Sequence, residues 1–135
     1  MPDHVSFTKT FHALESAISI AQQRHSCITG NISNLDTSNY KPKDIDFDTA
    51  MARALESDQR IALSRTHPGH IGVGLAPEHR IDPFEQTGEW NGYNWVNIDR
   101  EMLKLMENNL MHRAAVESLL RKIAILKDVI REGGR

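Results

Sequence analysis

The sequence has a single cysteine, Cys27, so no disulfide can form within the chain. It also lacks the CxxC and HExxH spacings by which zinc sites are usually recognised. Neither sign of charge is in large excess, because 16 basic residues face 18 acidic ones and the net charge is -2. A general nucleic-acid-binding domain needs a basic surface, so this class is excluded.

Long hydrophobic runs are also absent. The longest uninterrupted apolar run covers residues 123–126, which is far shorter than a membrane-spanning helix. The chain begins Met1-Pro2-Asp3, without the basic region that opens a secretory signal peptide. We therefore expect neither a membrane span nor a cleaved leader. The length of 135 residues fits one modest domain and excludes a TIM barrel or a multidomain enzyme.

Both ends of the chain carry apolar residues in alternating steps of four and three, the heptad spacing of long packed helices. The resulting fold prediction is mainly α, with long N- and C-terminal helices packed as a coiled-coil-like hairpin. We divide the single domain into an N-terminal helix (1–36), a central insert (37–96) and a C-terminal helix (97–135). The side chains expected to pack between helices are Phe11, Leu14, Ile18, Ile28, Ile32, Leu35, Met102, Leu105, Val116, Leu119, Ile123 and Leu126.

Polar residues interrupt both heptad patterns at His25, Asn109 and His112. Such positions often fix helix register or oligomeric state at some cost in stability. The alternative is an ordinary histidine or asparagine that is satisfied at a loosely packed edge. A second apolar stripe on the C-terminal helix, Leu103, Met106, Leu110 and Leu120, would stay in water in a two-helix hairpin, which favours assembly with further copies or partners.

The central insert is rich in proline, glycine and aromatic residues and is predicted to be rich in turns. Asp44, Asp46 and Asp48 precede apolar residues with helical spacing, so we predict a short helix of roughly three turns. The Asn91-Gly92 pair between aromatic residues predicts a type I′ turn and a small β-hairpin at residues 84–97. Residues 64–83 show no period and are predicted to form a loop.

The sequence offers little catalytic chemistry. His67, His70 and His79 could gather a metal in a small metal-dependent enzyme, but they lack a familiar ligand spacing. A solvated or interface loop is the preferred interpretation. Cys27 lies beside the predicted helix seam and is interpreted as a buried or interface thiol. We therefore expect no catalytic residue, no cofactor and no metal site; a soluble helical adaptor or chaperone remains an alternative function.

One segment of the sequence points to a particular protein family. Residues 30–41, Gly-Asn-Ile-Ser-Asn-Leu-Asp-Thr-Ser-Asn-Tyr-Lys, resemble the N-terminal signature of the bacterial flagellar rod and hook protein family, with matches at Asn31, Asn34, Thr37 and Tyr40. Ser38 and Asn39 stand where this signature has proline and glycine, and asparagine tolerates the left-handed backbone that glycine would adopt. Residues 44–47, 66 with 70–71, 97–102 and 107–110 are similar to the proximal-rod members of the family.

This resemblance implies a structural, non-enzymatic subunit of the flagellar basal-body rod, outside the cytoplasmic membrane and periplasmic in a two-membrane cell. It further implies export by the flagellar type III apparatus, assembly through the terminal helices, and no nucleic acid or small-molecule substrate. The implied partners are copies of the chain, other rod proteins, the adaptor FliE at the membrane ring and, transiently, the export apparatus. Phe7 and Phe11 resemble the export motif of early rod and hook substrates.

Overall fold

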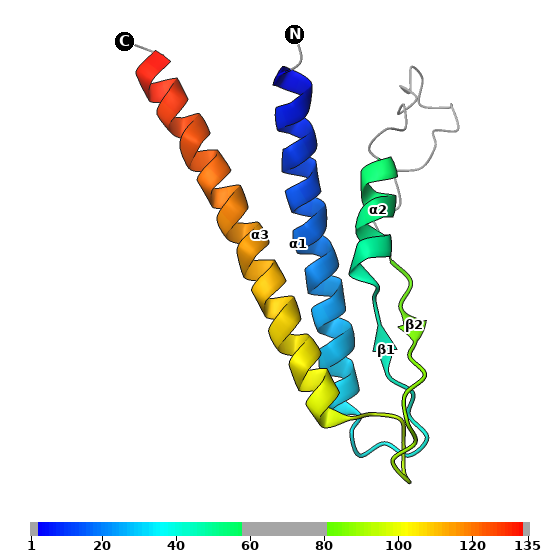
Figure 1. Ribbon diagram of the computed structural model, residues 1–135. Helices are drawn as coiled ribbons and strands as arrows, with labels where there is room; N and C mark the ends of the chain where they lie inside the picture. Colours follow the sequence, from blue (N-terminus) through cyan, green and yellow to red (C-terminus); the bar gives the residue numbers. More distant parts are fainter. Residues whose placement is uncertain (1–2, 58–80, 134–135) are drawn as a thin grey trace, which may run out of the picture.

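The computed structural model describes residues 3–57 and 81–133, with side chains from Thr8 onward and without that of Ser57. Two long helices dominate it, α1 (Asp3–Ser33) and α3 (Ile98–Gly133), and the shorter α2 (Phe47–Ser57) lies against α1 (Figure 1). Two short strands, β1 (Lys43–Asp44) and β2 (Phe84–Glu85), pair antiparallel beside them. The mainly helical prediction with long terminal helices is confirmed.

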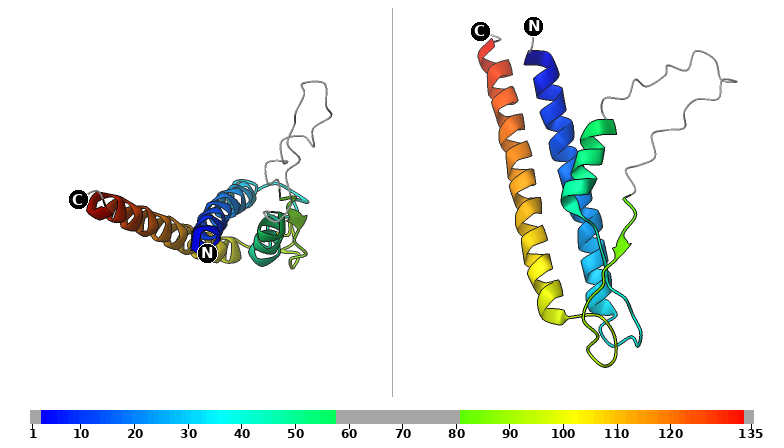
Figure 2. Two further views of the ribbon diagram at one scale, coloured as in Figure 1. Left: turned by 90° about the horizontal axis from the view of Figure 1, so that it is seen from above. Right: turned by 45° about the vertical axis from the view of Figure 1, so that its right-hand side comes forward.

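The hairpin of α1 and α3 is closed at one end and open at the other. At a rise of 1.5 Å per residue, α1 is about 46 Å long and α3 about 54 Å. The two helices lie closest near the connecting segments and diverge toward the chain termini, as both the front view and the view from above show (Figures 1 and 2). The parts of α1 and α3 nearest the termini therefore cover each other least.

The starts of α2 and α3 are fixed by side chains that cap these helices. Asn97 begins α3, because its Oδ1 accepts the backbone N–H groups of Asp99 at 3.0 Å and Arg100 at 3.2 Å. Asp99 and Glu101 add negative charge in the first turn, where the helix dipole favours it. Asp46 begins α2: its carboxylate accepts the Thr49 hydroxyl, and its carbonyl accepts the Ala50 N–H at 3.0 Å. The predicted short helix is confirmed.

The apolar core lies between α1, α2 and the segment around β1. Its buried residues are Ile20, Ile45, Ala50 and Ala54, and half-buried Cys27, Phe47, Met51 and Ile81 pack against them. This cluster contains no residue of α3. The core therefore holds α2 and β1 on α1, whereas α3 must be held on α1 by other contacts.

The sheet is not the hairpin that the Asn91-Gly92 pair predicted. β1 pairs with β2, with Lys43 opposite Glu85 and Asp44 opposite Phe84, so the two strands lie about forty residues apart in sequence. Gly92 has a φ of 95°, but Asn91 has no positive φ, and a type I′ turn needs both. Asn91 instead bonds across the loop through its side chain, which accepts the N–H groups of Tyr93 and Asn94. A two-stranded antiparallel sheet is present, but its predicted location was wrong.

The polar residues of the heptad pattern are also placed differently. His25 and Asn109 are exposed and His112 is half-buried, whereas Asn108, one residue away, is buried against α1. The predicted loop at residues 64–83 lies outside the described residues except for Ile81, Asp82 and Pro83.

Candidate functional site

The signature residues form one hydrogen-bonded unit at the end of α1. Asn34 closes the helix by donating its N–H to the Gly30 carbonyl at 3.1 Å and its Nδ2 to the same carbonyl at 2.8 Å. Thr37 returns a bond from its hydroxyl to Asn34 Oδ1 at 3.1 Å. Tyr40 donates its hydroxyl to Asn31 Oδ1 at 3.2 Å. We call residues 31–40 the signature turn; it brings the four matched side chains together and reverses the chain.

Asn39 takes the backbone conformation that the turn requires. Its φ is 58°, and among the described residues it is the single non-glycine residue with positive φ. Asparagine adopts this left-handed region more readily than most residues, so the expectation that it replaces glycine is confirmed. Its N–H donates to the Tyr93 carbonyl at 3.0 Å, and Trp95 N–H donates to the Tyr40 carbonyl at 3.2 Å. The segment before α3 therefore holds the turn in place.

Asn94 is the fully buried side chain of that segment. Its Nδ2 donates to the carbonyls of Leu35 and Thr37, and its Oδ1 accepts from Val96 N–H at 2.9 Å and from Asn91 Nδ2 at 2.8 Å. It links the signature turn to the segment that leads into α3. Sequence reasoning missed Asn94, because the Asn-Gly pair beside it suggested a local hairpin instead.

A buried polar cluster, formed by Arg24, Asn31, Asp44, Glu101 and Lys104, joins α1, β1 and α3. Asn31 lies at its centre with no exposed surface. Asn31 Nδ2 donates to Glu101 Oε2 at 2.8 Å and to the Lys43 carbonyl at 2.7 Å, while its Oδ1 accepts the Lys43 N–H at 2.9 Å. One carboxamide thus connects the end of α1 to β1 and to the first turn of α3.

The charges of the polar cluster are balanced. Arg24 Nε donates to Asp44 Oδ1 at 3.0 Å, and Lys104 Nζ lies 3.6 Å from Asp44 Oδ2 and 2.6 Å from Glu101 Oε1. Lys104 also donates to the side chain of Gln86. Two cations therefore face two carboxylates away from bulk water. Buried pairs of this kind add little net stability, because desolvation offsets attraction, but breaking one member is costly.

The predicted packing residues occupy a range of environments in the isolated chain. Ile28 is buried, and half-buried positions are Phe11, Leu14, Ile18, Ile32, Leu35, Leu105, Val116, Leu119 and Leu126. Met102 and Ile123 are exposed to 39% and 42%. Phe7 lies in α1, but its side chain is outside the described residues. Whether these residues pack between subunits stays a prediction.

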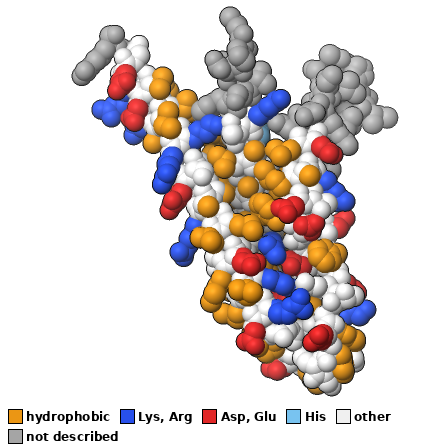
Figure 3. Space-filling view, viewed as in Figure 1, with side chains coloured by type: hydrophobic (Ala, Val, Ile, Leu, Met, Phe, Trp, Pro, Cys, Tyr) orange, Lys and Arg blue, Asp and Glu red, His pale blue; other side chains and the backbone are white. Residues whose placement is uncertain are grey.

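Apolar side chains remain exposed along α3. Leu103, Met106 and Leu110 form an outer stripe on the side of the helix away from α1, and Leu110 is 72% exposed. Leu119, Ile123, Leu126 and Ile130 form a distal seam on the side that faces α1, by the 3.6-residue period. Ile130 in that seam is 73% exposed and lies near the C-terminal end of α3, where the two helices diverge (Figure 1). Figure 3 shows hydrophobic side chains on the surface along α3.

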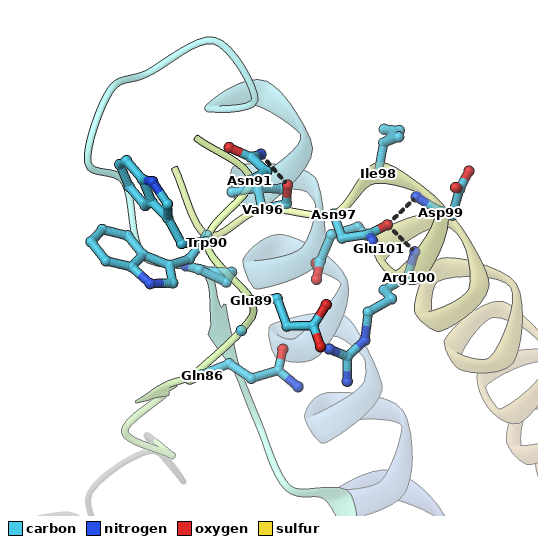
Figure 4. A pocket seen from close by; sticks show the side chains of 13 residues that line it. Gln86, Glu89, Trp90, Asn91, Val96, Asn97, Ile98, Asp99, Arg100 and Glu101 are labelled. Carbon is cyan, nitrogen blue, oxygen red and sulfur yellow. Dashed lines mark hydrogen bonds between the residues drawn. The ribbon is translucent and has the colours of Figure 1, made fainter. Parts of the chain in front are cut away.

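A shallow pocket of about 370 Å³ lies between the insert and the start of α3 (Figure 4). Trp90 and Trp95, whose ring centroids are 4.5 Å apart, line one part of it. Three of its polar side chains have partners within the protein: Asn97 caps α3, Gln86 accepts from Lys104, and Glu101 belongs to the polar cluster. The pocket therefore forms part of the joint between the insert and α3.

The structure gives no support for metal or thiol chemistry in the described residues. In residues 3–57 and 81–133, no three side chains of the types His, Cys, Asp and Glu gather closely enough to hold a metal ion. The candidates His67, His70 and His79 lie outside that part of the chain. Burial, followed by the nearby Asp44 carboxylate, raises the pKa of the Cys27 thiol. A raised pKa lowers the thiolate fraction, so this thiol is a weaker nucleophile at neutral pH than an ordinary exposed cysteine. Among the described helices, none is long and apolar enough to cross a membrane.

Comparison with known proteins decides the family. The chain is 30% identical to the flagellar basal body rod protein FlgB of Bacillus subtilis over 129 residues, which covers 94% of this chain and 97% of the relative. The FlgB proteins of Aquifex aeolicus and Escherichia coli are each 28% identical, over 84% and 88% of this chain and 86% and 91% of their own length. The chain belongs to the FlgB family of flagellar basal body rod proteins. No protein-family model matches it.

Membership of the FlgB family confirms the resemblance found in the signature turn. It also narrows the broader rod and hook family to a rod protein. It does not support the adaptor or chaperone interpretation, and FlgB proteins are structural proteins, not enzymes. Because the matches extend over most of each relative, they include both long helices that the polar cluster joins. The features of this FlgB-family chain that matter for assembly are therefore the hydrogen bonds of the polar cluster and the exposed apolar side chains along α3.

Proposed function

We infer that the chain is a structural subunit of the proximal rod of the flagellar basal body, assembled through its terminal helices. The observation that carries this inference is the near full-length similarity to flagellar basal body rod proteins named FlgB. The exposed apolar residues of α3 support it, since side chains such as Ile130 and Leu110 are costly to leave in water.

Assembly would bury these residues. The distal seam lies where α1 and α3 diverge (Figure 1), and an apolar helix face from a neighbouring copy would cover its exposed residues Ile123 and Ile130. Burying a large aliphatic side chain is worth about 1.5–3 kcal/mol relative to leaving it exposed. A contact that joins different surfaces of successive copies builds an open rod when the rotation between copies does not close into a ring.

The finer points of the proposal rest on the family resemblance. The partners are other rod proteins and the adaptor FliE at the membrane ring, and the subunit reaches them through the flagellar type III export apparatus. Phe7 and Phe11 are the proposed export motif. The rod lies outside the cytoplasmic membrane, in the periplasm of a two-membrane cell.

Deleting the gene in its host and imaging isolated basal bodies tests the proposal. We expect a membrane ring without a rod, restored by the wild-type gene. Complementation with Ile123→Asp should fail, because a charge in a buried seam costs several kcal/mol. Ala124→Asp is the matched control: the same charge one residue away lies about 100° round the helix, beside Arg121 and Lys127. Rods in the deletion strain would overturn the proposal, and equal behaviour of the two variants would reject the distal seam.

A further inference from the structure

The fully buried side chains of α3 are polar. Among its described residues only Glu101 and Asn108 are buried, with exposures of 2% and 1%. Glu101 accepts from Asn31 near the end of α1, and Asn108 Nδ2 donates to the Ala21 carbonyl at 2.8 Å, farther back along α1. Two directional contacts, seven residues apart on α3, therefore hold the helix pair at two heights.

The apolar side chains of α3 do not by themselves fix its register on α1. They recur every three or four residues along the helix and extend round it, from the distal seam to the outer stripe. Sliding α3 along α1 by one helical turn would replace one set of aliphatic contacts by another of similar size. A shifted register would instead separate the buried Glu101 carboxylate from the Asn31 amide that donates to it and would break the bond from Asn108 to the Ala21 carbonyl, so both buried polar groups would need new partners.

Asn108 also shows a deficit that fits this role. Its Oδ1 is buried and has no hydrogen-bond partner among the described residues. An unsatisfied buried oxygen makes the position less stable than an apolar side chain of similar size would be. Single polar residues in otherwise apolar helix seams are known to specify register and oligomeric state at such a cost.

We propose that Glu101 and Asn108 are positioning residues for assembly, which fix the register and angle of α3 on α1. By fixing them, they present the outer stripe and the distal seam to neighbouring copies at one height. The part that concerns assembly rests on the proposed function, whereas the register of α3 is a property of the isolated chain. The role expected for seam position Asn109 thus falls to its neighbour Asn108.

The test compares Asn108→Leu with the control Asn109→Leu in the full chain. Asn109 is exposed, so the control adds the same side chain without entering the α1–α3 contact. Spin labels at the exposed positions Glu15 and Ser118, in a Cys27→Ala background, report the α1–α3 distance distribution by pulsed electron resonance. The thermal midpoint reports stability, and complementation of the deletion strain reports assembly.

For Asn108→Leu we expect an equal or higher thermal midpoint, a broadened or shifted distance distribution, and loss of motility. Asn109→Leu should match the wild type in all three. A single unchanged distance in Asn108→Leu would overturn the proposal, whatever its motility. Loss of the helical signal in Asn108→Leu would also overturn it, because Asn108 would then be needed for stability and not for register. A changed distance with normal motility would refute the assembly part alone and leave the proposed function standing.

Discussion

Replacing Asn31 by alanine is the sharpest test of the polar cluster. The carboxamide has four partners: the N–H and carbonyl of Lys43, the Glu101 carboxylate and the Tyr40 hydroxyl. The substitution removes all four bonds and leaves a small cavity at a site without exposed surface. Glu101 then keeps Lys104 as a partner but loses its link to α1.

The magnitude follows from those four bonds. A neutral hydrogen bond contributes about 1 kcal/mol net and a bond to a charged group about 2 kcal/mol. Three neutral bonds and one to a carboxylate give about 5 kcal/mol, which water entering the cavity would reduce, so we expect a loss of about 3–5 kcal/mol. Domains of this size are stable by about 5–15 kcal/mol. The variant should therefore lie close to its unfolding transition.

Urea denaturation followed by far-ultraviolet circular dichroism measures this loss, with Asn34→Ala as the matched control. Asn34 is half-buried, its Nδ2 donates to a carbonyl that already accepts the Asn34 N–H, and its Oδ1 accepts from the exposed Thr37. Its loss should cost about 1 kcal/mol. Equal free energies of unfolding for the two variants would refute the argument that Asn31 joins three elements while Asn34 only ends a helix.

Three further predictions concern the insert, the glycines and export. Gly88→Ala should destabilise the insert and change tryptophan fluorescence, because the new Cβ would lie 2.7 Å from the Trp95 carbonyl oxygen. Gly30→Ala has open space at its helical position and should raise the free energy of unfolding by about 1 kcal/mol. The Thr49 hydroxyl, with the Asp48 and Thr49 amides, lowers the pKa of Asp46. The stabilisation from its ionised carboxylate is therefore present above the pKa that Asp46 has in the unfolded chain, and it is lost as the pH falls through the pKa of Asp46 in the folded chain. The urea midpoints of wild type and Asp46→Ala should therefore differ at neutral pH and approach each other as the pH falls through the folded pKa of Asp46. Changing both Phe7 and Phe11 to alanine should trap the chain in the cytoplasm, and unchanged secretion would remove the export interpretation.

The long helices could be predicted from sequence because their signal is local and repeated. Apolar residues at steps of three and four define α1 and α3 over their whole length, and Asp46 and Asn97 stand at helix starts where capping residues are expected. The signature turn could also be predicted from sequence, since its four side chains contact one another within ten residues. Asn39 could be assigned for the same reason.

The contacts between distant segments could not be predicted. β2 pairs with β1 about forty residues earlier, and no local turn signal encodes that pairing. The heptad pattern predicted for the C-terminal helix falls on Asn109 and misses Asn108, because a heptad drifts by about 20° per repeat on a straight helix. In addition, the face of α3 that meets α1 is marked by Glu101, Lys104 and Asn108, whereas hydrophobic spacing looks for apolar residues.

The central claim is that the polar cluster holds α1 and α3 together within one subunit, whereas neighbouring subunits cover the ends of these helices near the chain termini. Amide hydrogen exchange, measured on the purified chain and on isolated basal bodies, tests it most directly. In the purified chain we predict slow exchange around the polar cluster, at residues 24–33 and 101–110, and fast exchange at 117–133. In basal bodies, residues 117–133 should become protected. Equal protection along the whole of α3 in the purified chain, unchanged in basal bodies, would contradict the account.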